Sequence, residues 1–498
     1  MTRLSLKALP QLAPEVAVPR YRRDQLSPGI LHVGLGNFHR AHQALYMDDL
    51  FNLGRDHDWA LVGAGVRPND DAMRRTLAAQ DWLTTVVELE PGGANTARVT
   101  GAMIDFAGVA SGNGPLLEAM VDPRIRIVAM TVTEGGYFVD PATGAFDADH
   151  AEIKADAAAL DRPQTVFGVI VEALRRRRAA GIPPFSVMSC DNLPGNGHAA
   201  GRAVVGLATL VDPALADWIG QDVAFPNSMV DRITPATTDA QRAMLEEDFG
   251  IDDGWPVFCE PFRQWVMEDR FVAGRPAFEE VGVTFTTDVA AFEFMKLRIL
   301  NGGHATIAYP AALLDIHFVH DAMADPLVAG FLNKLEREEI LPVVPPVPGV
   351  SLTEYLALIE RRFANPGVGD TIPRLCLDGS NRQPKFVLAS TRDRVRKGWS
   401  VTGLALESAL WCRYLQGETD SGAAITIDDV QAERLQVLAK RARTEPLAFL
   451  ELRDIFGDLA DAPAFQQAFS GALTSLWRDG TAKTLQRYLD LQPGESLG

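Results

Sequence analysis

The stretch Phe292–His304 contains the residue types that acid–base chemistry needs. On an α-helix at about 100° per residue, four of its polar side chains share about two-fifths of the circumference, and these are Glu293, Lys296, Asn301 and His304. A lysine amine acts as a base near neutral pH only if burial or a nearby positive charge lowers its pKa. An asparagine amide can donate a hydrogen bond to an oxygen that gains negative charge. The pattern indicates one wall of a substrate pocket, and the alternative is a solvated helix face.

A glycine-containing turn near the start of the chain has the pattern of a nucleotide site. Residues 30–33 form a short apolar run that leads into Gly34 and Gly36, and a helical pattern covers residues 41–53. Strand, glycine turn and helix in this order open a dinucleotide-binding unit, where backbone N–H groups at the helix start bind a pyrophosphate. The third glycine of the usual Gly-x-Gly-x-x-Gly pattern is replaced by His39.

The second strand of such a unit carries the residue that selects between NAD and NADP. This strand is expected at residues 59–66, and Arg67 and Asp70 follow it. A carboxylate there would accept hydrogen bonds from the ribose 2′-hydroxyl, whereas an arginine would bind a 2′-phosphate. We favour NAD, because Asp70 and Asp71 outnumber the single arginine. The alternative role of Asp70 is to cap the helix that we expect to begin near Ala72.

Further strands bring polar residues to the same edge of the expected sheet. They are predicted at residues 83–89, 98–104, 125–131 and 185–189. Thr133 and Glu134 follow the third of these strands, at the edge where open α/β sheets place their ligand crevice. We expect both residues near the nicotinamide ribose. Asn192 follows the fourth strand, and a later segment delivers Asp231.

The rest of the chain divides into an arm, a helix of the first domain and a second, helical domain. Residues 1–28 are rich in proline and charge, and we expect an arm that wraps the domain or stays mobile. Residues 166–180 form a predicted helix whose run Arg175 to Arg178 we interpret as a solvated face. Helices are also expected at residues 305–320, 326–337, 353–363, 404–415, 430–443, 447–456 and 465–480. We therefore predict an α/β protein with a Rossmann-type dinucleotide-binding domain at residues 1–287, followed by a mainly α-helical substrate and catalytic domain at residues 288–498.

Composition restricts the class of protein. The chain has 498 residues and a formal net charge of −18, which argues against nucleic-acid binding because phosphate contacts need a basic surface. No apolar stretch is long enough for a membrane helix, and the N-terminus lacks a signal-peptide core. We expect a cytoplasmic protein with a small-molecule substrate and without a nucleic-acid or membrane partner.

The sequence contains one weak candidate for a metal site. The four cysteines are far apart and form no Cys-x-x-Cys pair, so they indicate reduced thiols. His317, His320 and Asp321 have a spacing that would place three ligands on one helix face. Their alternative is a polar helix end. We expect no metal, because nothing else in the chain indicates one.

Several motifs resemble those of one enzyme family. The spacing Lys296-x-x-x-x-Asn301-x-x-His304 is similar to the signature of the polyol-specific long-chain dehydrogenases, the mannitol dehydrogenase family. The other matching runs, in the family's order, are Gly34-Leu-Gly-Asn-Phe-His-Arg-Ala41, Thr131-Val-Thr-Glu-Gly-Gly-Tyr137, Met188-Ser-Cys-Asp-Asn-Leu-Pro194, Phe225-Pro-Asn-Ser-Met-Val-Asp-Arg-Ile-Thr-Pro235 and Cys259-Glu-Pro-Phe-Arg-Gln-Trp-Val-Met-Glu-Asp-Arg-Phe271. The resemblance is closest to the mannitol dehydrogenase branch, although the hexuronate reductases share many of these runs.

The resemblance implies an NAD-dependent, zinc-independent enzyme that interconverts D-mannitol and D-fructose, with D-arabinitol as a further substrate, and that is monomeric. It implies that Lys296 is the general acid and base and that Asn192 and Asn301 form an oxyanion hole. His304 would orient a substrate hydroxyl, and Glu293 would pass the released proton toward solvent. The cofactor residues that it implies are Gly34, Gly36, Asn37, Phe38, His39, Arg40, Asp70, Thr133 and Glu134. The alternatives are a structural histidine at His304 and an exposed ion pair of Glu293 with Lys296.

Substrate recognition is the part where the sequence departs from the family. Asp231, Arg374 and Arg382 lie in segments that resemble the family's substrate contacts, but Arg382 stands where we expect lysine. Gly303 stands where relatives often carry serine. Arg374 and Arg382 together would suit a carboxylate, so the runner-up is a hexuronate reductase acting on fructuronate or tagaturonate. The rival from another class is a catalytically silent nucleotide-binding regulator.

Overall fold

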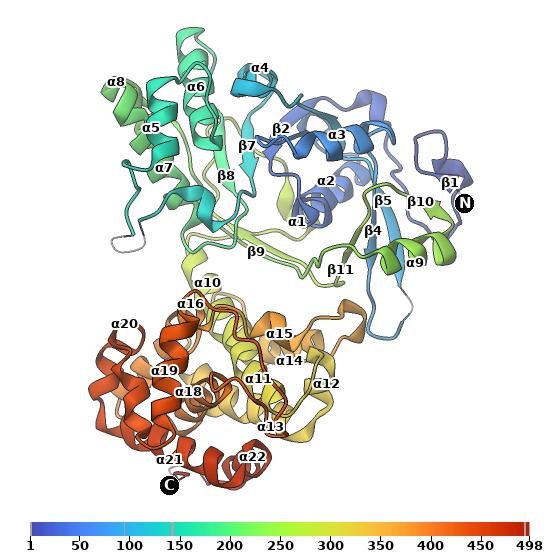
Figure 1. Cartoon of the computed structure of the whole chain (residues 1–498). Helices are drawn as coiled ribbons and strands as arrows, with labels where there is room; N and C mark the ends of the chain where they lie inside the picture. The colour runs from blue at the N-terminus through green and yellow to red at the C-terminus, as the bar shows by residue number, and fades with distance from the viewer. Residues whose placement is uncertain (1, 94, 141–143, 493–494, 498) are drawn as a thin grey trace. The chain divides into compact units, whose positions relative to one another are not determined.

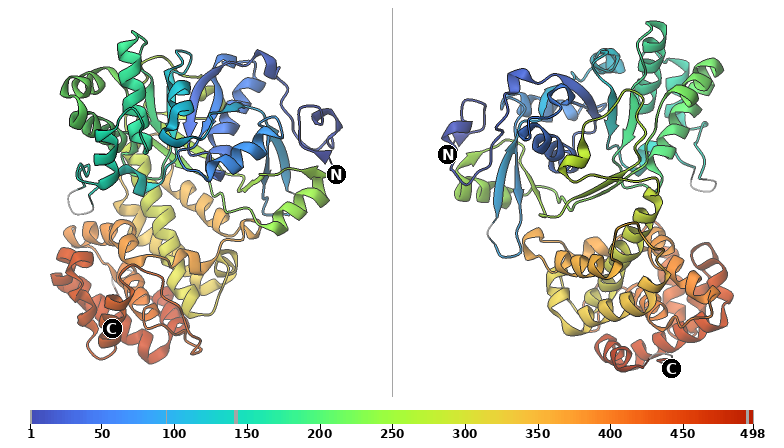
Figure 2. Two further views of the ribbon diagram at one scale, coloured as in Figure 1. Left: turned by 45° about the horizontal axis from the view of Figure 1, so that its top comes forward. Right: turned by 180° about the vertical axis from the view of Figure 1, so that it is seen from behind.

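The chain forms two compact units, Met1–Ala290 (unit 1) and Ala291–Gly498 (unit 2). The structure is a computed structural model that describes residues 2–93, 95–140, 144–492 and 495–497. All strands of the described residues lie in unit 1, and unit 2 is built from helices, as Figures 1 and 2 show. The predicted class, a Rossmann-type unit followed by a mainly helical one, is confirmed.

Unit 1 is organised around a parallel sheet. Among its described residues the sheet has five strands in the order β6-β3-β2-β7-β8. These are β2 (Pro28–Val33), β3 (Ala60–Ala64), β6 (Met103–Phe106), β7 (Ile127–Met130) and β8 (Ser186–Ser189). The sheet grows from β2 in both directions, so the strand order reverses between β2 and β7. Ligands of open α/β sheets bind at the carboxyl ends of the strands at such a reversal.

Helices cover both faces of this sheet because successive strand residues point to opposite sides. Along β2, Leu31 and Val33 pack against α4, α6 and α7, whereas Ile30 packs on the side of α2 and α3. The α-helices in the described part of unit 1 are α1 (Asn37–Ala41), α2 (Gln43–Asn52), α3 (Asp70–Ala78), α4 (Gly114–Val121), α5 (Ala151–Ala158), α6 (Val166–Ala179), α7 (Asn196–Val211), α8 (Pro213–Asp222) and α9 (Asp239–Phe249).

Three smaller sheets complete the described part of unit 1, with the strand orders β11-β4-β5, β13-β12-β9 and β1-β10. Their strands are β1 (Thr2–Arg3), β4 (Thr84–Glu88), β5 (Thr96–Thr100), β9 (Ser228–Asp231), β10 (Ile251–Asp252), β11 (Val257–Cys259), β12 (Gln264–Met267) and β13 (Thr284–Phe285). The single strand predicted at residues 98–104 is wrong, because β5 and β6 belong to different sheets. The chain crosses between them at Gly101, and the Arg23 guanidinium fixes the crossing by donating to the carbonyl oxygens of Gly101 (2.9 Å) and Met103 (2.6 Å).

The N-terminal arm wraps unit 1. The Ala17 amide donates to the Ala97 carbonyl oxygen at 3.1 Å, and the Val99 amide donates to the Ala17 carbonyl oxygen at 2.8 Å, so the arm extends the sheet beside β5. The solvated face predicted for residues 175–178 is wrong at Arg177. This side chain is buried and donates to the carbonyl oxygens of Met120 and Asp122 at the end of α4 and to that of Pro183 after α6.

Unit 2 is built around α18 (Thr402–Tyr414), whose residues are all buried, and around α11 (Gly302–Leu313), which packs against α13, α15 and α18. The other α- and π-helices of its described residues are α10 (Val289–Met295), which begins before the unit boundary, the π-helix Lys296–Asn301, α12 (Val319–Ala324), α13 (Pro326–Leu335), the π-helix Glu336–Ile340, α14 (Leu352–Phe363), α15 (Ile372–Leu375), α16 (Gly379–Phe386), α17 (Leu388–Arg396), α19 (Ala432–Ala442), α20 (Arg453–Phe456), α21 (Pro463–Asp479) and α22 (Thr481–Asp490). The single helix predicted at residues 305–320 is wrong: α11 ends at Leu313, and Asp315 has a left-handed backbone (φ +60°) that no helix continues through.

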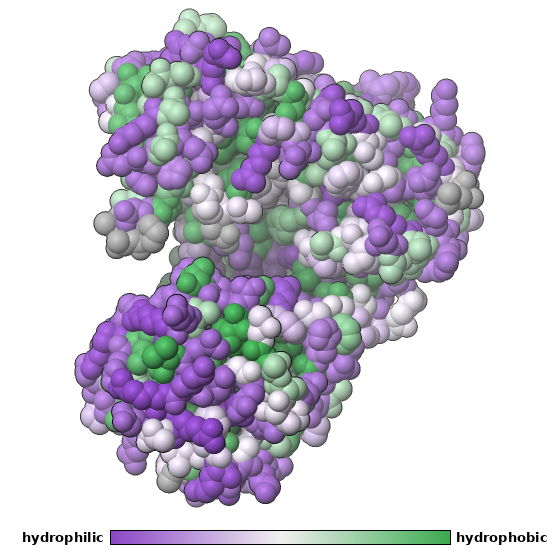
Figure 3. Space-filling model, viewed as in Figure 1, coloured by the Kyte–Doolittle hydropathy of each residue, from purple (hydrophilic) through white to green (hydrophobic). Residues whose placement is uncertain are grey.

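Hydrophilic side chains cover most of the face that Figure 3 displays. In the described part of the chain, none of the helices has the length and apolar character that a membrane crossing requires.

Candidate active site

The two glycines of the turn after β2 serve different purposes. Gly34 has φ +89°, and a Cβ there would lie 2.0 Å from the Thr131 carbonyl oxygen at the end of β7. Gly34 is therefore required by the close approach of two strands. Gly36 caps α1, and a Cβ there would meet no atom within 4 Å. The turn thus leaves open space beside Gly36, where a pyrophosphate would have to fit.

The side chains of Asn37 and Arg40 tie this turn to the chain after β9. The Arg40 guanidinium donates to Asn37 Oδ1 at 2.7 Å and to the Trp255 carbonyl oxygen, and Asn37 Nδ2 donates to the Pro235 carbonyl oxygen at 3.0 Å. Burial lowers the pKa of Arg40 to about 10. Both side chains hold the shape of the turn from inside the protein.

The aromatic residues of the turn pack beneath it. The His39 ring lies 3.7 Å from the His32 ring in the interior, and burial lowers the pKa of His39 well below its ordinary value. His32 in turn contacts the Thr131 hydroxyl through Nε2 at 3.0 Å. The Phe38 ring stacks on His42 with 4.6 Å between the centroids. The His39 imidazole therefore supports the turn, and its backbone lies in the turn itself.

Asp70 lies just beyond the carboxyl end of β3. Its Oδ2 accepts a hydrogen bond from the Arg67 amide at 3.0 Å, and its carboxylate lies over Gly65, where an added Cβ would be 2.1 Å from Oδ2. Helix α3 begins at Asp70 itself and not near Ala72, and its N-cap is Asn69. The carboxylate therefore closes the turn between β3 and α3, at the strand end where a ribose is expected.

The turn after β7 has an unusual backbone. Thr133 has φ +66° and ψ 162°, and its amide donates to Asp191 Oδ1 at 2.8 Å. The Val132 amide donates to Asp191 Oδ2 at 3.0 Å. Glu134 begins a short 3₁₀-helix (Glu134–Tyr137), and its side chain lies outside the described part of the structure.

The two remaining site residues predicted in unit 1 follow or end strands. Asn192 lies in an exposed bend three residues after Ser189, the last residue of β8. Asp231 is the last residue of β9, is buried, and is paired in the sheet with Gln264 of β12. The structure thus places Thr133 and Asn192 at the carboxyl ends of adjacent strands of the main sheet.

In unit 2 the prediction that Glu293, Lys296, Asn301 and His304 lie on one continuous α-helix is wrong. Residues Lys296–Asn301 form a π-helix, and the Gly302 amide bonds to the Leu297 carbonyl oxygen five residues earlier. Residues five apart lie one above the other in a π-helix, so Lys296 and Asn301 share a face instead of being separated by about 140°. Lys296 is buried, and Asn301 Oδ1 is buried without a hydrogen bond to any described residue. Such π segments occur frequently at functional sites.

His304 and Glu293 flank the π-helix. The His304 ring, near the start of α11, stacks on Phe363 of α14 with 4.1 Å between centroids and 16° between planes. At Gly303 an added Cβ would lie 3.3 Å from atoms of both Leu332 and Phe363, so a larger residue would press on the ring that orients His304. Glu293 is half-buried on α10, one helical turn before Lys296.

An ion pair controls the orientation of Arg374. The Arg374 guanidinium donates a hydrogen bond to each carboxylate oxygen of Asp370, both at 2.5 Å. Burial alone would raise the pKa of Asp370, but the hydrogen bonds and charge of Arg374, together with the charge of His304, hold that pKa below its usual range. Arg382 donates to the backbone carbonyl oxygens of Arg374 (3.3 Å) and Leu375 (3.1 Å). The structure therefore brings the two arginines together.

The residues considered as zinc ligands make other contacts. Phe318 packs between the rings of His317 and His320, and His320 Nε2 lies 3.6 Å from Asp321 Oδ1. Among the described residues, no group of three or more side chains is arranged to hold a metal ion.

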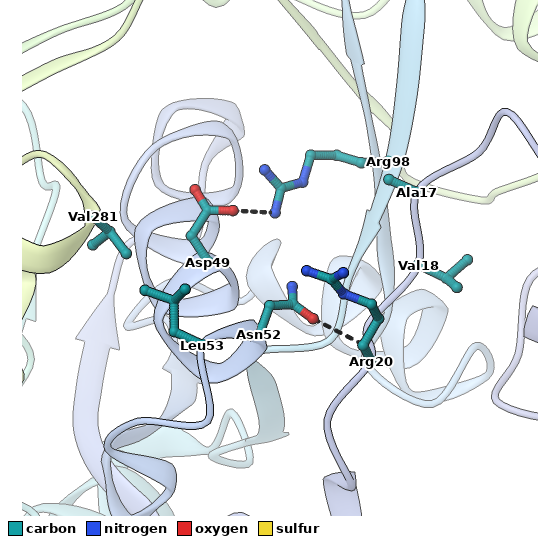
Figure 4. Close-up of a pocket in the computed structure, with 8 residues that line it drawn as sticks. All are labelled: Ala17, Val18, Arg20, Asp49, Asn52, Leu53, Arg98 and Val281. Atoms are coloured by element: carbon teal, nitrogen blue, oxygen red, sulfur yellow. Dashed lines mark hydrogen bonds and ion pairs between the residues drawn. The ribbon is translucent and has the colours of Figure 1, made fainter.

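A separate cavity of about 590 Å³ lies at the far end of α2 from the glycine turn. Figure 4 shows its lining residues, which are Ala17, Val18, Arg20, Asp49, Asn52, Leu53, Arg98 and Val281. Arg98 pairs with Asp49 at 2.7 Å, and the Arg20 amide donates to Asn52 Oδ1 at 2.9 Å. The first contact joins β5 to α2, and the second fastens the arm to α2. The lining includes none of the residues predicted to bind cofactor or substrate.

Two carboxylates of the site, Asp191 and Asp370, were not among the residues predicted from the sequence. Asp191 stands beside Asn192 in one of the matching runs, so its position directly after an apolar strand was the available signal. Asp370 precedes Arg374 by four residues, a spacing at which opposite charges pair on a helix. Both carboxylates orient groups that were predicted to touch cofactor or substrate.

These features define a two-domain dehydrogenase. The first unit is of the Rossmann type, with a glycine turn and polar residues at its strand ends, and the second is helical and carries a buried lysine near an asparagine amide. The chain belongs to the mannitol dehydrogenase family. Residues 28–280 match the family model of the mannitol dehydrogenase Rossmann domain, and residues 288–477 match that of the mannitol dehydrogenase C-terminal domain. The family expected from the sequence motifs is confirmed.

Relatives and solved structures agree with this family over nearly the whole chain. A mannitol 2-dehydrogenase of Cereibacter sphaeroides is 59% identical over 95% of this chain and 99% of its own length. The Pseudomonas fluorescens mannitol 2-dehydrogenase, solved as a ternary complex with NAD and D-mannitol, has a TM-score of 0.85 and 42% identity, and covers 98% of this chain and 100% of its own. A D-sorbitol dehydrogenase in substrate-free form has a TM-score of 0.91 and 35% identity, and covers 97% of this chain and 100% of its own.

Proposed function

We propose that this chain oxidises D-mannitol to D-fructose with NAD and catalyses the reverse reduction, with D-arabinitol as a further substrate and without a metal ion. It is an NAD-dependent polyol dehydrogenase. The observation that carries the choice of substrate is the 59% identity, over nearly the full length of both chains, to a mannitol 2-dehydrogenase. The proposal extends to a monomer that acts in the cytoplasm, which light scattering and cell fractionation would test.

The residues of the glycine turn fit the proposed cofactor. The open space at Gly36 gives a pyrophosphate room beside the start of α1, and the close contact of Gly34 with Thr131 fixes the turn. Asp70, at the end of β3, would accept from a ribose hydroxyl and repel a 2′-phosphate, which favours NAD over NADP. Asn37, His39 and Arg40 would support the turn from beneath. When bound, NAD supplies the hydride acceptor for the alcohol carbon.

We assign the proton chemistry to the helix of unit 2. Lys296 takes the hydroxyl proton in oxidation and returns it in reduction. Its buried position suits this role, because burial favours the neutral amine that acts as the base. Asn301, on the same face of the π-helix, and Asn192 donate amide hydrogens to the substrate oxygen as it gains charge. Glu293 passes the released proton toward solvent. His304, held by its stacking on Phe363, orients a neighbouring hydroxyl.

The contacts of Arg374 favour a polyol over a hexuronate. A substrate carboxylate needs an uncompensated positive charge, but Asp370 binds the Arg374 guanidinium at both oxygens and offsets that charge. Arg382 already donates to two backbone carbonyl oxygens. Neutral hydroxyls need hydrogen-bonding groups in fixed positions, which Asp231 and the oriented arginines would provide. The hexuronate reductase is therefore the second choice.

The test measures NADH oxidation by chelator-treated protein with D-fructose and with D-fructuronate, repeats both with NADPH, and identifies the hexitol formed. We expect rapid reduction of fructose with NADH, and D-mannitol as the product. D-Sorbitol as the product would mean that the enzyme acts on D-sorbitol, the C2 epimer of D-mannitol. A preference for fructuronate would favour the hexuronate reductase. Absence of turnover with every pair would support the silent regulator, and recovery of activity only with added zinc would refute metal independence.

A further inference from the structure

The backbone of Thr133 adopts a conformation that residues with a side chain rarely reach. Its φ of +66° and ψ of 162° lie in a region populated almost only by glycine. A strained residue persists only where its surroundings hold it, and such residues gather at ligand sites. The identity of the group that holds Thr133 therefore matters for function.

The Asp191 carboxylate provides this hold. It is buried, and it accepts hydrogen bonds from the amides of Val132 (3.0 Å) and Thr133 (2.8 Å) and from the Tyr137 hydroxyl (2.7 Å). The Tyr137 oxygen also lies 2.5 Å from Ser189 Oγ at the end of β8. Burial, together with the Asp191 charge, raises the pKa of Tyr137 well above its ordinary value, so the phenol stays a donor. One carboxylate thus joins the turn after β7 to the end of β8.

The turn that Asp191 holds lies beside the glycine turn. The Thr131 hydroxyl donates to the Gly34 carbonyl oxygen at 2.5 Å, and Thr131 follows β7 directly. The strained peptide therefore stands at the reversal of strand order between β2 and β7, which is the edge where dinucleotides bind in such sheets. Asn192 is the next residue after Asp191, so the hydrogen bonds that hold Asp191 also restrict the position of Asn192.

We propose that Asp191 is a positioning residue that holds the strained 132–133 peptide against the cofactor crevice and thereby also fixes Asn192. This role rests on the proposed function, because it presumes that NAD binds at this edge. In this role Asp191 acts through the turn that it holds and needs no contact with substrate or cofactor. Loss of its charge lets Thr133 relax toward negative φ, which displaces the turn that borders the nicotinamide end of the crevice.

The decisive variant is Asp191→Asn, which replaces one acceptor oxygen by an NH₂ group that faces donors. We expect the Kd for NADH to rise at least tenfold and kcat for mannitol oxidation to fall at least tenfold. Adding Thr133→Gly to this variant should restore most of the NADH affinity, because glycine reaches the same φ without strain. A merely structural role of Asp191 would give no such rescue.

Asp156 provides a matched control in the same unit. Its buried carboxylate accepts from the amides of Gln164 (2.7 Å) and Thr165 (2.9 Å) and from the Thr165 hydroxyl (2.6 Å), nearly the same donor set as at Asp191. Asp156→Asn should lower the thermal unfolding midpoint and leave the Kd for NADH within twofold. If Asp191→Asn does the same and no more, the positioning role is refuted.

Two further outcomes separate the inference from the proposed function. If Asp191→Asn does not fold, Tyr137→Phe removes one donor to the same carboxylate, and an unchanged Kd for NADH and kcat in that variant would overturn the proposal. A wild-type protein that binds no NADH and oxidises no polyol would remove the proposed function. Normal turnover in the wild type together with normal turnover in Asp191→Asn would remove only the positioning role.

Discussion

In unit 1 the candidate site residues lie at strand ends and on the turns and helix starts that follow them, whereas four of those in unit 2 lie on one helical segment. The turns need left-handed backbone at Gly34 (φ +89°) and Thr133 (φ +66°), and hydrogen bonds from other segments hold them. The segment from Glu293 to His304 is held by its own backbone ladder, with a π-helix in the middle. Substitutions in unit 1 should therefore act through the shape of a turn, and those in unit 2 through the chemistry of the side chain.

The two units also differ in the buried groups that they keep neutral. Burial lowers the pKa of His32 and of His42 in unit 1, each to about 3. Burial raises the pKa of Glu339 to about 7 and of Glu407 to about 8 in unit 2. The buried imidazoles of unit 1 resist protonation and the buried carboxyl groups of unit 2 resist ionisation, so the stabilities of the two units should respond to pH in opposite directions.

The largest effect should come from Lys296→Ala, which removes the proposed general base from unit 2 and leaves the turns of unit 1 unchanged. We expect kcat to fall by roughly 10³-fold, within the usual range for loss of a general acid or base. The Kd for NADH should stay within twofold, because the residues proposed to bind the cofactor lie in unit 1. Stopped-flow turnover and NADH titration measure the two quantities. Lys440→Ala, on the exposed side of α19, is the control, and retained turnover in Lys296→Ala would refute the assignment of the base.

The two glycines of the turn should separate shape from binding. Gly34→Ala places a Cβ 2.0 Å from the Thr131 carbonyl oxygen, and we expect a loss of about 3 kcal/mol in the free energy of unfolding. Gly36→Ala meets no atom within 4 Å, so its stability should change by less than about 0.5 kcal/mol. The same methyl group should raise the Kd for NADH about tenfold by filling the pyrophosphate space. Urea unfolding and NADH titration of both variants test this, and unchanged NADH binding in Gly36→Ala would contradict the cofactor placement.

Asp370→Asn should show that unit 2 recognises substrate through an oriented charge. Arg374 would lose an ionised partner, and we expect KM for mannitol to rise about tenfold, the effect of one weakened charged hydrogen bond, with a smaller change in kcat. Because the Arg374 charge is then uncompensated, activity with fructuronate should rise relative to fructose. Asp461→Asn breaks an exposed Arg453–Asp461 pair in the same unit and should change neither value. Equal effects of the two variants would argue against a role of Asp370 in recognition.

The sequence predicted what depends on local pattern. The strand at residues 30–33, the glycine turn and the following helix are recognisable because apolar runs and glycine spacing determine them locally. The π-helix was missed because an α-helical period of 3.6 residues assumes one register throughout. The break between β5 and β6 was missed because their residues have similar β propensity, and contacts with residues far away in the sequence, such as Arg23 of the arm, fix the crossing between the two strands.

Side-chain partners far apart in sequence explain the other misses. Arg177 belongs to a basic run that resembles a solvated face, but the carbonyl oxygens of Met120 and Asp122, more than fifty residues earlier, bind it inside unit 1. Asp191 and Asp370 were not singled out, because a carboxylate that orients another residue has no motif of its own. The roles proposed for Lys296, Asn301 and Asn192 came from family spacing and stay predictions.

The smallest effect should be the change of the free energy of unfolding with pH, which we expect to differ between the two units. The folded-state pKa of Glu407 is raised above the ordinary 4.5, so the stability that Glu407 contributes is present below pH 4.5 and is lost as pH rises through about 8. Between pH 7 and pH 9 we expect unit 2 to lose about 1 kcal/mol through this group. His32 has a lowered pKa, so its contribution is present above pH 6.5 and is lost as pH falls toward about 3.

Hydrogen exchange can measure the two units separately, through peptides of α18 and of β2 corrected for intrinsic exchange rates. Glu407→Gln keeps an oxygen for the Gln383 amide, which donates to Glu407 at 2.6 Å, but cannot ionise. The alkaline loss of protection in α18 should therefore shrink in this variant, while protection of β2 keeps its acid sensitivity. Exposed Glu433→Gln should leave both responses as in the wild type. An alkaline loss of the same size in Glu407→Gln would mean that other buried acids, such as Glu336 and Glu339, determine the response of unit 2.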